Sequence, residues 1–159
     1  SRPLADYRDE AVRASIAAEV LRMVETGKRE PGILAWILGN ENNSVFEDVN
    51  TPDREARAEA YFAFVNSLAK QIKAIDPSRP VIMGLGETQF SDLAGRSTPD
   101  VDAVGWIVYE GQTFKDLFEA YSKNIAKPMI ALEYGADSYN AQTQKPDEAS
   151  QARYLISLW

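Results

Sequence analysis

Carboxylate side chains follow the ends of short apolar runs in this chain of 159 residues. Glu41 comes soon after the apolar run 33–38, and Glu133 comes directly after the run 129–132. Two carboxyl groups about 5–5.5 Å apart can serve as nucleophile and acid/base in the retaining cleavage of a glycosidic bond. Glu41 and Glu133 are therefore the first candidates for chemistry.

The composition removes most other catalytic chemistries. The chain contains no cysteine and no histidine, which excludes thiol nucleophiles, Ser-His-Asp triads and histidine-ligated zinc. Its net charge of −7 disfavours nucleic acid as a partner, because phosphate binding depends on lysine and arginine. No apolar run reaches the roughly 18–20 residues of a membrane span. We expect no metal and no cofactor, and the opening residues carry no secretory leader pattern.

The candidate carboxylates need elements that bring distant strand ends together. Apolar residues spaced three or four apart predict helices over about 6–26, 52–75, 113–125 and 146–159, with a short one near 89–94. Unbroken apolar runs predict strands over 33–38, 80–84, 101–109 and 129–132. Strands that alternate with helices indicate an α/β fold with a parallel sheet.

Helix ends and buried faces follow from the same patterns. Thr51 and Pro52 predict the start of the second long helix, as its cap and its first residue. In the first helix, the spacing places Met23 on the buried face. In the last helix, it places Ile156 and Trp159 near one apolar face.

Functional residues of parallel α/β folds collect where the strands end. The other candidates near these ends are Asn40, Asn42, Glu87, Trp106, Tyr109 and Tyr134. A lone glutamate in such a place is often only solvated, and Glu87 and Glu110 fit that interpretation. Tryptophans inside apolar runs more often pack in the core than bind sugars. For Trp106, both core packing and sugar binding are possible interpretations.

Four segments, taken in order, resemble glycoside hydrolase family 2 and related (β/α)8 glycosidases of the same clan. Residues 36–41, WILGNE, resemble the W-x-L-G-N-E segment that ends the fourth barrel strand. Residues 76–81, DPSRPV, are similar to the entry to strand five, and residues 102–109 resemble strand six. Residues 127–137, KPMIALEYGAD, resemble the segment around strand seven.

The resemblance implies roles for the residues that match. Glu41 would be the general acid/base, Glu133 the nucleophile, and Tyr109 a hydrogen-bond donor to that nucleophile. The pKa of Glu41 would have to lie above that of Glu133. The enzyme would be a retaining β-glycosidase or a transglycosidase, with a β-linked carbohydrate as substrate and no cofactor.

The remaining candidates would bind the sugar. Asn40 would hold a sugar hydroxyl, and Trp106 and Tyr134 would offer apolar faces to the ring. Asn42 and Glu87 complete the expected substrate-binding set.

Two departures from the family pattern stand out. Ile107 occupies the position where family members often carry asparagine, two residues before the tyrosine. The match also runs only from about helix three to helix seven, whereas a complete barrel needs about 250 residues. We therefore expect residues 1–159 to be a single segment of a partial TIM (β/α)8 barrel, lacking strands one to three and eight. Its open sheet edges would favour self-association, and the isolated segment would be inactive.

Three alternatives are compatible with the sequence. The sugar and linkage are not specified, so β-galactosidase-like and β-1,3-glucanosyltransferase-like activities both fit the pattern. A non-catalytic carbohydrate-binding relative would keep the motifs without turnover. A small, complete, doubly wound α/β domain would instead bind its ligand where the strand order reverses.

Overall fold

A computed structural model of the chain describes residues 5–46, 52–86, 88–109 and 111–159. Its main sheet contains β1 (Trp36–Leu38), β2 (Val81–Leu85), β3 (Ala103–Val108) and β4 (Met129–Tyr134). The helices are α1 (Glu10–Gly27), α2 (Arg54–Ile75), α3 (Ser91–Ser97), α4 (Leu117–Asn124) and α5 (Glu148–Leu158). A 3-10 turn, η1 (Ser44–Phe46), follows β1, and β5 (Tyr139–Asn140) and β6 (Lys145–Pro146) form a small antiparallel hairpin before α5.

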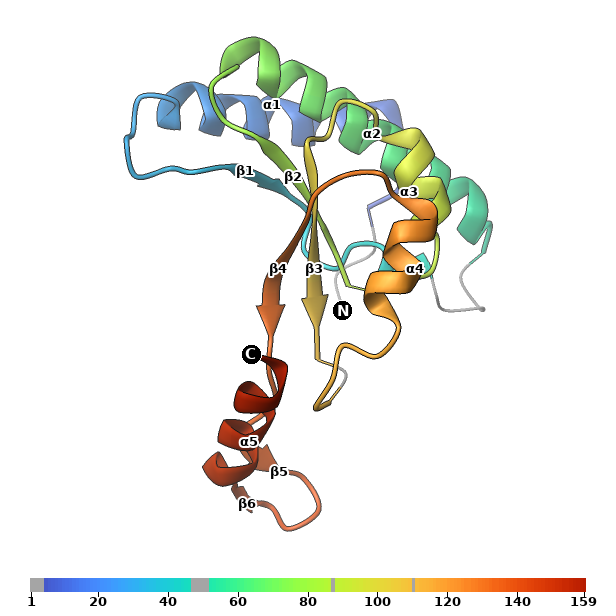
Figure 1. Ribbon diagram of the computed structural model, residues 1–159. Helices are drawn as coiled ribbons and strands as arrows, with labels where there is room; N and C mark the ends of the chain where they lie inside the picture. The colour runs from blue at the N-terminus through green and yellow to red at the C-terminus, as the bar shows by residue number, and fades with distance from the viewer. Residues whose placement is uncertain (1–4, 47–51, 87, 110) are drawn as a thin grey trace.

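The four main strands are parallel and lie in the order β1-β2-β3-β4. The helices α1 to α4 cover one side of this twisted sheet (Figure 1). The α/β prediction is confirmed. The doubly wound alternative is wrong, because the strand order contains no reversal at which a ligand crevice could form.

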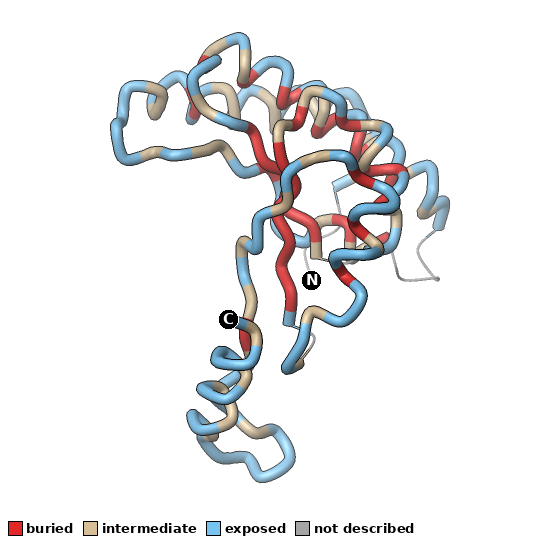
Figure 2. Tube along the Cα trace, viewed as in Figure 1, coloured by how far each residue is buried: buried red, intermediate tan, exposed pale blue. Residues whose placement is uncertain are grey.

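Alternate residues of the strands build the core beneath the helices. Met83 and Leu85 of β2 and Trp106 of β3 belong to the buried cluster, together with Phe62 and Ile72 of α2. Figure 2 shows this burial running along β2 and β3 and along the helix surfaces that face them. The helix α2 is amphipathic at a spacing of three and four residues, and its apolar side is what covers the strands.

The opposite side of the sheet, which we call the open face, is built from small and aliphatic residues. Gly84 of β2 lies beside Gly105 of β3 in the register, and the Leu132 side chain of β4 fills the space above Gly105. A Cβ atom at Gly105 would collide with Leu132. On the two edge strands, Ile37 is 52% exposed and Ile130 is 40% exposed. Self-association through these edges stays a prediction.

The helix α1 starts later than the sequence predicts, and one of its predicted inward residues faces outward. The helix starts after Asp9, whose carboxylate accepts the N–H groups of Ala11 and Val12 at 2.8 and 3.5 Å. The prediction that Met23 faces inward is wrong, because Met23 is 61% exposed and Val24 is buried instead. The inward positions continue in steps of four through Val20 to Val24, and Met23 falls outside that stripe.

The start of α2 also differs from expectation. The helix begins at Arg54, after Asp53 in the left-handed region with φ of 53°, and Asp53 provides no side-chain cap. Pro52 therefore lies before the helix rather than in its first turn, and Thr51 lies outside the described residues.

The last helix forms where the sequence predicts, but its apolar face is not packed. Every residue of α5 is at least partly exposed, and Ile156 and Trp159 are 77% and 97% exposed. The β5–β6 hairpin carries α5 beyond the end of β4 and away from the other helices (Figure 1). Residue spacing predicts a helix but not the surface that will cover it. Among the described helices, none combines the length and apolarity needed to cross a membrane.

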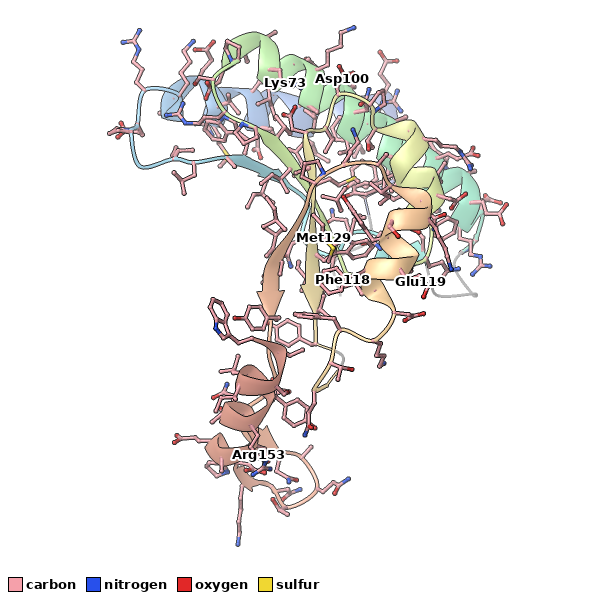
Figure 3. The ribbon with its side chains drawn as sticks, in the orientation of Figure 1. Lys73, Asp100, Phe118, Glu119, Met129 and Arg153 are labelled. Atoms are coloured by element: carbon pink, nitrogen blue, oxygen red, sulfur yellow. The ribbon has the colours of Figure 1, made fainter. Side chains whose placement is uncertain are left out.

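The amino-terminal edge of the sheet is held by charged groups. The Trp36 indole N–H donates to Asp76 at 3.0 Å, and Arg79 donates to the same carboxylate at 2.7 Å. Lys73 forms an ion pair with Asp102 at 2.7 Å, and Figure 3 places Lys73 at this edge, far from Arg153 of α5. These contacts fix the starts of the strands and leave the carboxyl ends for the candidate site.

Candidate active site

Glu41 lies in a sharp turn directly after β1. Gly39 and Glu41 both adopt positive φ angles, of 81° and 56°. The left-handed region is unfavourable for a glutamate, so the surrounding contacts must hold Glu41 there. Its side chain extends from the end of β1 across to the end of β2. A Cβ atom placed on Gly86 would come within 2.9 Å of both Cβ and Cγ of Glu41.

Two buried side chains support this turn from below. The Asn43 side chain is fully buried, and its amide oxygen accepts the Gly86 N–H at 2.9 Å, which ties the β1 and β2 ends together. The Tyr61 hydroxyl of α2 lies directly under Gly39, 2.6 Å from where a Cβ would stand. Burial raises the pKa of the Tyr61 phenol, which keeps it neutral. Neither residue was among the sequence candidates, and an asparagine beside the Asn-Glu pair was the available signal for Asn43.

A β-bulge turns Glu133 toward the open face. Ala131 pairs with Trp106, and the next pair is Glu133 with Ile107, so Leu132 is an extra residue on β4. In a regular strand, Leu132 and Glu133 would point to opposite faces. The bulge instead lets Glu133 share the register position of Ile107, on the same face as Gly105. Bulges are known devices for re-aiming a side chain next to a site.

Tyr109 is hydrogen-bonded to Glu133 and lies within electrostatic range of Glu41. Its hydroxyl donates to Glu133 Oε2 at 3.1 Å, the contact expected from the sequence. The hydrogen bond to Glu133 raises the pKa of Tyr109, loss of solvent around the phenol raises it further, and the charges of Glu133, Glu41 and Asp137 add to the rise. All three carboxylates therefore lie within electrostatic range of one phenol at the carboxyl ends of the strands.

The two asparagines beside Glu41 differ in their surroundings. Asn40 is exposed, and its backbone N–H donates to the Asn42 side-chain oxygen at 2.9 Å. The Asn42 amide nitrogen donates to the Tyr7 hydroxyl at 3.4 Å. Asn42 therefore stabilises the turn through both its amide oxygen and its amide nitrogen. Asn40 is exposed and lies next to Glu41, the acid/base candidate.

The prediction that Trp106 offers a face to a sugar is wrong. Trp106 is 0% exposed and lies on the helix-covered side, with its ring centroid 6.3 Å from that of Tyr121. Its position three residues before Tyr109 places the two side chains on opposite faces, since strand residues alternate. Tyr134 pairs in register with the core residue Val108, and its ring lies 6.1 Å from Phe114, away from the side that carries Glu133.

The remaining predicted residues add little to the site as described. Ile107 is 3% exposed and stands below Tyr109, so the position that often holds asparagine is apolar here. Glu87 and Glu110 lie outside the described residues. Within the described ranges, no three acidic side chains gather closely enough to hold a metal ion.

The glutamate with a tyrosine donor lies on the strand at one edge of the sheet, and the second glutamate follows the strand at the other edge. Residues 5–155 match the family described as "Glycosyl hydrolases family 2, TIM barrel domain". The chain belongs to this family. The four-stranded sheet is therefore part of a TIM barrel, as the sequence motifs indicated.

The curated relatives are β-glucuronidases rather than galactosidases. The chain is 25% identical over 146 residues to the Rattus norvegicus protein, covering 86% of this chain and 20% of that one. It is 29% identical over 128 residues to the Sus scrofa protein, covering 73% of this chain and 17% of that one. The chain thus spans about a fifth of the length of the curated relatives it matches.

Solved structures share the same fold. A β-glucuronidase from Bacteroides uniformis superposes with a TM-score of 0.73 at 20% identity, over 94% of this chain and 20% of that one. A β-D-glucuronidase from Dictyoglomus thermophilum gives a TM-score of 0.59 at 16% identity, over 88% of this chain and 25% of that one.

Proposed function

We propose that this chain supplies the two catalytic carboxylates of a retaining β-glycosidase. The observation that carries the proposal is the Tyr109 hydrogen bond to Glu133, with Glu41 in electrostatic range of the same phenol. Family membership adds that this constellation stands at the carboxyl ends of barrel strands, where TIM-barrel enzymes carry their chemistry.

The proposed reaction has two steps. In the first, the Glu133 carboxylate attacks the anomeric carbon, and the bond from that carbon to the leaving oxygen breaks while Glu41 gives this oxygen its proton. In the second, Glu41 takes a proton from water, and the hydroxide oxygen displaces Glu133 from the anomeric carbon. An acceptor sugar in place of water gives transglycosylation by the same route. Tyr109 orients Glu133 through both steps.

We propose a β-glucuronide as the first substrate class to test, because the curated relatives carry the name β-glucuronidase. A panel of 4-nitrophenyl β-glycosides separates this sugar from the alternatives, namely galactose, glucose and mannose. The exposed Asn40 beside Glu41 is the side chain we assign to a sugar hydroxyl. Turnover of another glycoside in preference to the glucuronide would revise the sugar without changing the roles of the two glutamates.

We further propose that residues 1–159 contribute strands four to seven of the barrel. The exposed Ile37 and Ile130 on the two edge strands support this, because additional strands would pair with both edges and cover these side chains. Activity is therefore to be measured on the complete polypeptide that carries this segment, and we expect the isolated segment to be inactive.

A trapping experiment tests the proposed function. The complete polypeptide is incubated with a 2-deoxy-2-fluoro-β-glycosyl fluoride of the preferred sugar, digested and mapped by mass spectrometry. We expect one fluoroglycosyl adduct on the peptide that contains Glu133, and none in the matched variant Glu133→Gln. An adduct on a different carboxylate would refute the assignment of the nucleophile.

The second candidate is a non-catalytic carbohydrate-binding relative. The observation that favours it is the buried, apolar Ile107 in place of the asparagine often found at this position. Such a protein would bind sugars but would leave the fluoroglycoside unreacted, so the same experiment separates the two functions.

A further inference from the structure

The helix α5 lies beyond the carboxyl end of β4, the strand that carries Glu133 (Figure 1). Its first turn is fixed by Asp147, whose carboxylate accepts the Ser150 N–H at 3.0 Å and the Ser150 hydroxyl at 2.7 Å. The Asp147 N–H donates to the Ser138 carbonyl oxygen at 2.7 Å. The start of α5 is therefore attached to residues 135–138, GADS, which leave β4 and which we call the β4 loop.

One turn further along α5, the Gln151 side chain holds the same loop. Its Nε2 donates to the Ala136 carbonyl oxygen at 3.1 Å, and Gln151 is half-buried. Gly135, which precedes Ala136, has a φ of 151°, so the chain turns at a residue that has no Cβ to strain. The loop thus bends at Gly135 and is held by a side-chain donor at the next residue.

The β4 loop and α5 both contact Tyr109. A Cβ atom at Gly135 would lie 3.8 Å from Cε1 of Tyr109 and 3.5 Å from Cδ2 of Leu155 in α5. The Tyr109 ring and the Leu155 side chain therefore share the same side of Gly135. Tyr154 of α5 reaches the segment after β3, where a Cβ at Gly111 would lie 3.9 Å from its Cε1. The helix α5 thus contacts the chain that follows Tyr109 and the chain that follows Glu133.

The orientation of Glu133 depends on Tyr109. The Tyr109 hydroxyl donates to Glu133 Oε2 at 3.1 Å, and no other side chain of the described residues donates to that carboxylate. Tyr109 is itself 56% exposed, so several rotamers are open to it unless its neighbours restrict them. Gly135 and Leu155 are neighbours that restrict the ring, and Gln151 holds the loop to which Gly135 belongs.

We propose that Gln151 of α5 is a positioning residue for the nucleophile. It holds the β4 loop against the Tyr109 ring, and Tyr109 in turn holds Glu133 in the orientation for attack. The inference rests on the proposed function, because it takes Glu133 as the nucleophile. It gives α5 a role in the reaction although no residue of this helix has to touch the substrate.

Labelling of Glu133 by the 2-deoxy-2-fluoro-β-glycosyl fluoride measures nucleophilic attack separately from the later steps. In the complete polypeptide, Gln151→Leu removes the donor to Ala136. We expect the labelling rate constant at saturating reagent to fall about 3- to 10-fold, as for the loss of one neutral hydrogen bond. Gln151→Glu keeps the size of the side chain and also loses the donor, so it provides a second measurement with the same expected direction.

The matched control is Gln71→Leu in α2. The Gln71 amide also donates to a backbone carbonyl, that of Ser67 at 3.2 Å, but on an exposed helix surface away from β4. Its labelling rate constant should equal that of the wild type. A wild-type rate constant in both Gln151 variants, with a lower melting temperature, would assign Gln151 to the anchoring of α5 alone and overturn the inference.

Gln151→Leu is also combined with Tyr109→Phe. If Gln151 acts through the Tyr109 hydroxyl, then adding Gln151→Leu to Tyr109→Phe should slow labelling no further. The same loss in both backgrounds would overturn the inference, because Gln151 would then act independently of Tyr109. Absence of labelling in the wild-type protein would instead overturn the proposed function, and the role of Gln151 with it.

Discussion

The two candidate carboxylates are held by different kinds of structure. Glu133 lies on a sheet strand, is turned to the open face by the bulge at Leu132, and accepts a hydrogen bond from Tyr109. Glu41 lies in a turn with a left-handed backbone, and its side chain rests against Gly86. The nucleophile is thus fixed by a strand and a donor, and the acid/base by backbone geometry and packing.

This difference matches what the two proposed roles require. A nucleophile must stand within bonding distance of one carbon, and a strand holds a side chain more tightly than a loop does. An acid/base must exchange its proton with a leaving group and then with water, so it needs access to the solvent side. The exposed turn that carries Glu41 provides that access.

The largest expected effect is on kcat/KM in the two alanine variants. How that loss depends on the leaving group distinguishes the nucleophile from the acid/base. Glu133→Ala should lower kcat/KM on the order of 10⁴-fold or more for every glycoside, because the covalent route is lost. Glu41→Ala should lower kcat/KM about 10²–10⁴-fold for a methyl glycoside, whose oxygen must be protonated. It should have little effect on kcat/KM for a dinitrophenyl glycoside, which departs without a proton. Steady-state kinetics with Glu19→Ala, an exposed glutamate on α1, provide the control. Equal losses for both leaving groups in Glu41→Ala would contradict the assignment.

The next effect tests packing beneath the acid/base. Gly86→Ala introduces a methyl group where only 2.9 Å separates it from Cβ and Cγ of Glu41, so the carboxyl must move. A displacement of about 1 Å costs on the order of 10²-fold in rate, and we expect kcat to fall by that order for poor leaving groups. Gly32→Ala is the matched control, because a Cβ there meets no atom within 4 Å among the described residues. A Gly86→Ala enzyme with unchanged kinetics would show that this contact does not position Glu41.

A smaller effect tests the donor to the nucleophile. Tyr109→Phe removes the hydroxyl that lies 3.1 Å from Glu133 Oε2, and a hydrogen bond to a charged group corresponds to about 10- to 100-fold in rate. We expect the loss in kcat for all leaving groups alike, in contrast to Gly86→Ala. Tyr139→Phe, at a residue of similar exposure, should behave as wild type. A loss confined to poor leaving groups would place Tyr109 with Glu41 instead.

The smallest expected effect on catalysis lies at the other end of β1. Hydrogen bonds from Ser78, Arg79 and Trp36 hold the pKa of Asp76 well below its usual value. Because the pKa is lowered by folding, the stabilisation is present above about pH 4 and is lost as the pH falls toward the lowered pKa.

Asp76→Asn should therefore lower the melting temperature at neutral pH and make it less sensitive to acid, with kcat unchanged. Thermal unfolding between pH 3 and 7 measures this, alongside kcat at pH 7. A large fall in kcat with an unchanged melting temperature would contradict this. It would mean that the Asp76 contacts at the start of β1, and not the turn after β1, set the position of Glu41.

The sequence was sufficient to place both glutamates at strand ends, because apolar runs and the residues that follow them are local features. It was also sufficient for the alternation of strands and helices. The bulge at Leu132 could not be predicted, since it depends on how β4 pairs with β3. The Asn43 contact with Gly86 joins residues 43 apart in sequence, and spacing patterns do not report such pairs.

Trp106 illustrates an error that alternation along the strand could have prevented. An unbroken apolar run does not say which residue faces which side, but Tyr109 and Trp106 differ by three positions and so point to opposite faces. The exposed apolar residues of α5 show a second feature that the sequence pattern does not predict. The helix was predictable from spacing, whereas the surface that covers Ile156 and Trp159 is not encoded in their spacing.

In the proposed reaction, Glu41 and Glu133 act on one glycosidic bond from opposite sides. Azide rescue of the two alanine variants, in the complete polypeptide, measures this through the anomeric configuration of the glycosyl azide by NMR. We predict the β-azide from Glu41→Ala, where azide replaces water on the covalent intermediate, and the α-azide from Glu133→Ala, where azide replaces the missing nucleophile. The same anomer from both variants, or no azide product from either, would contradict the roles assigned to Glu41 and Glu133.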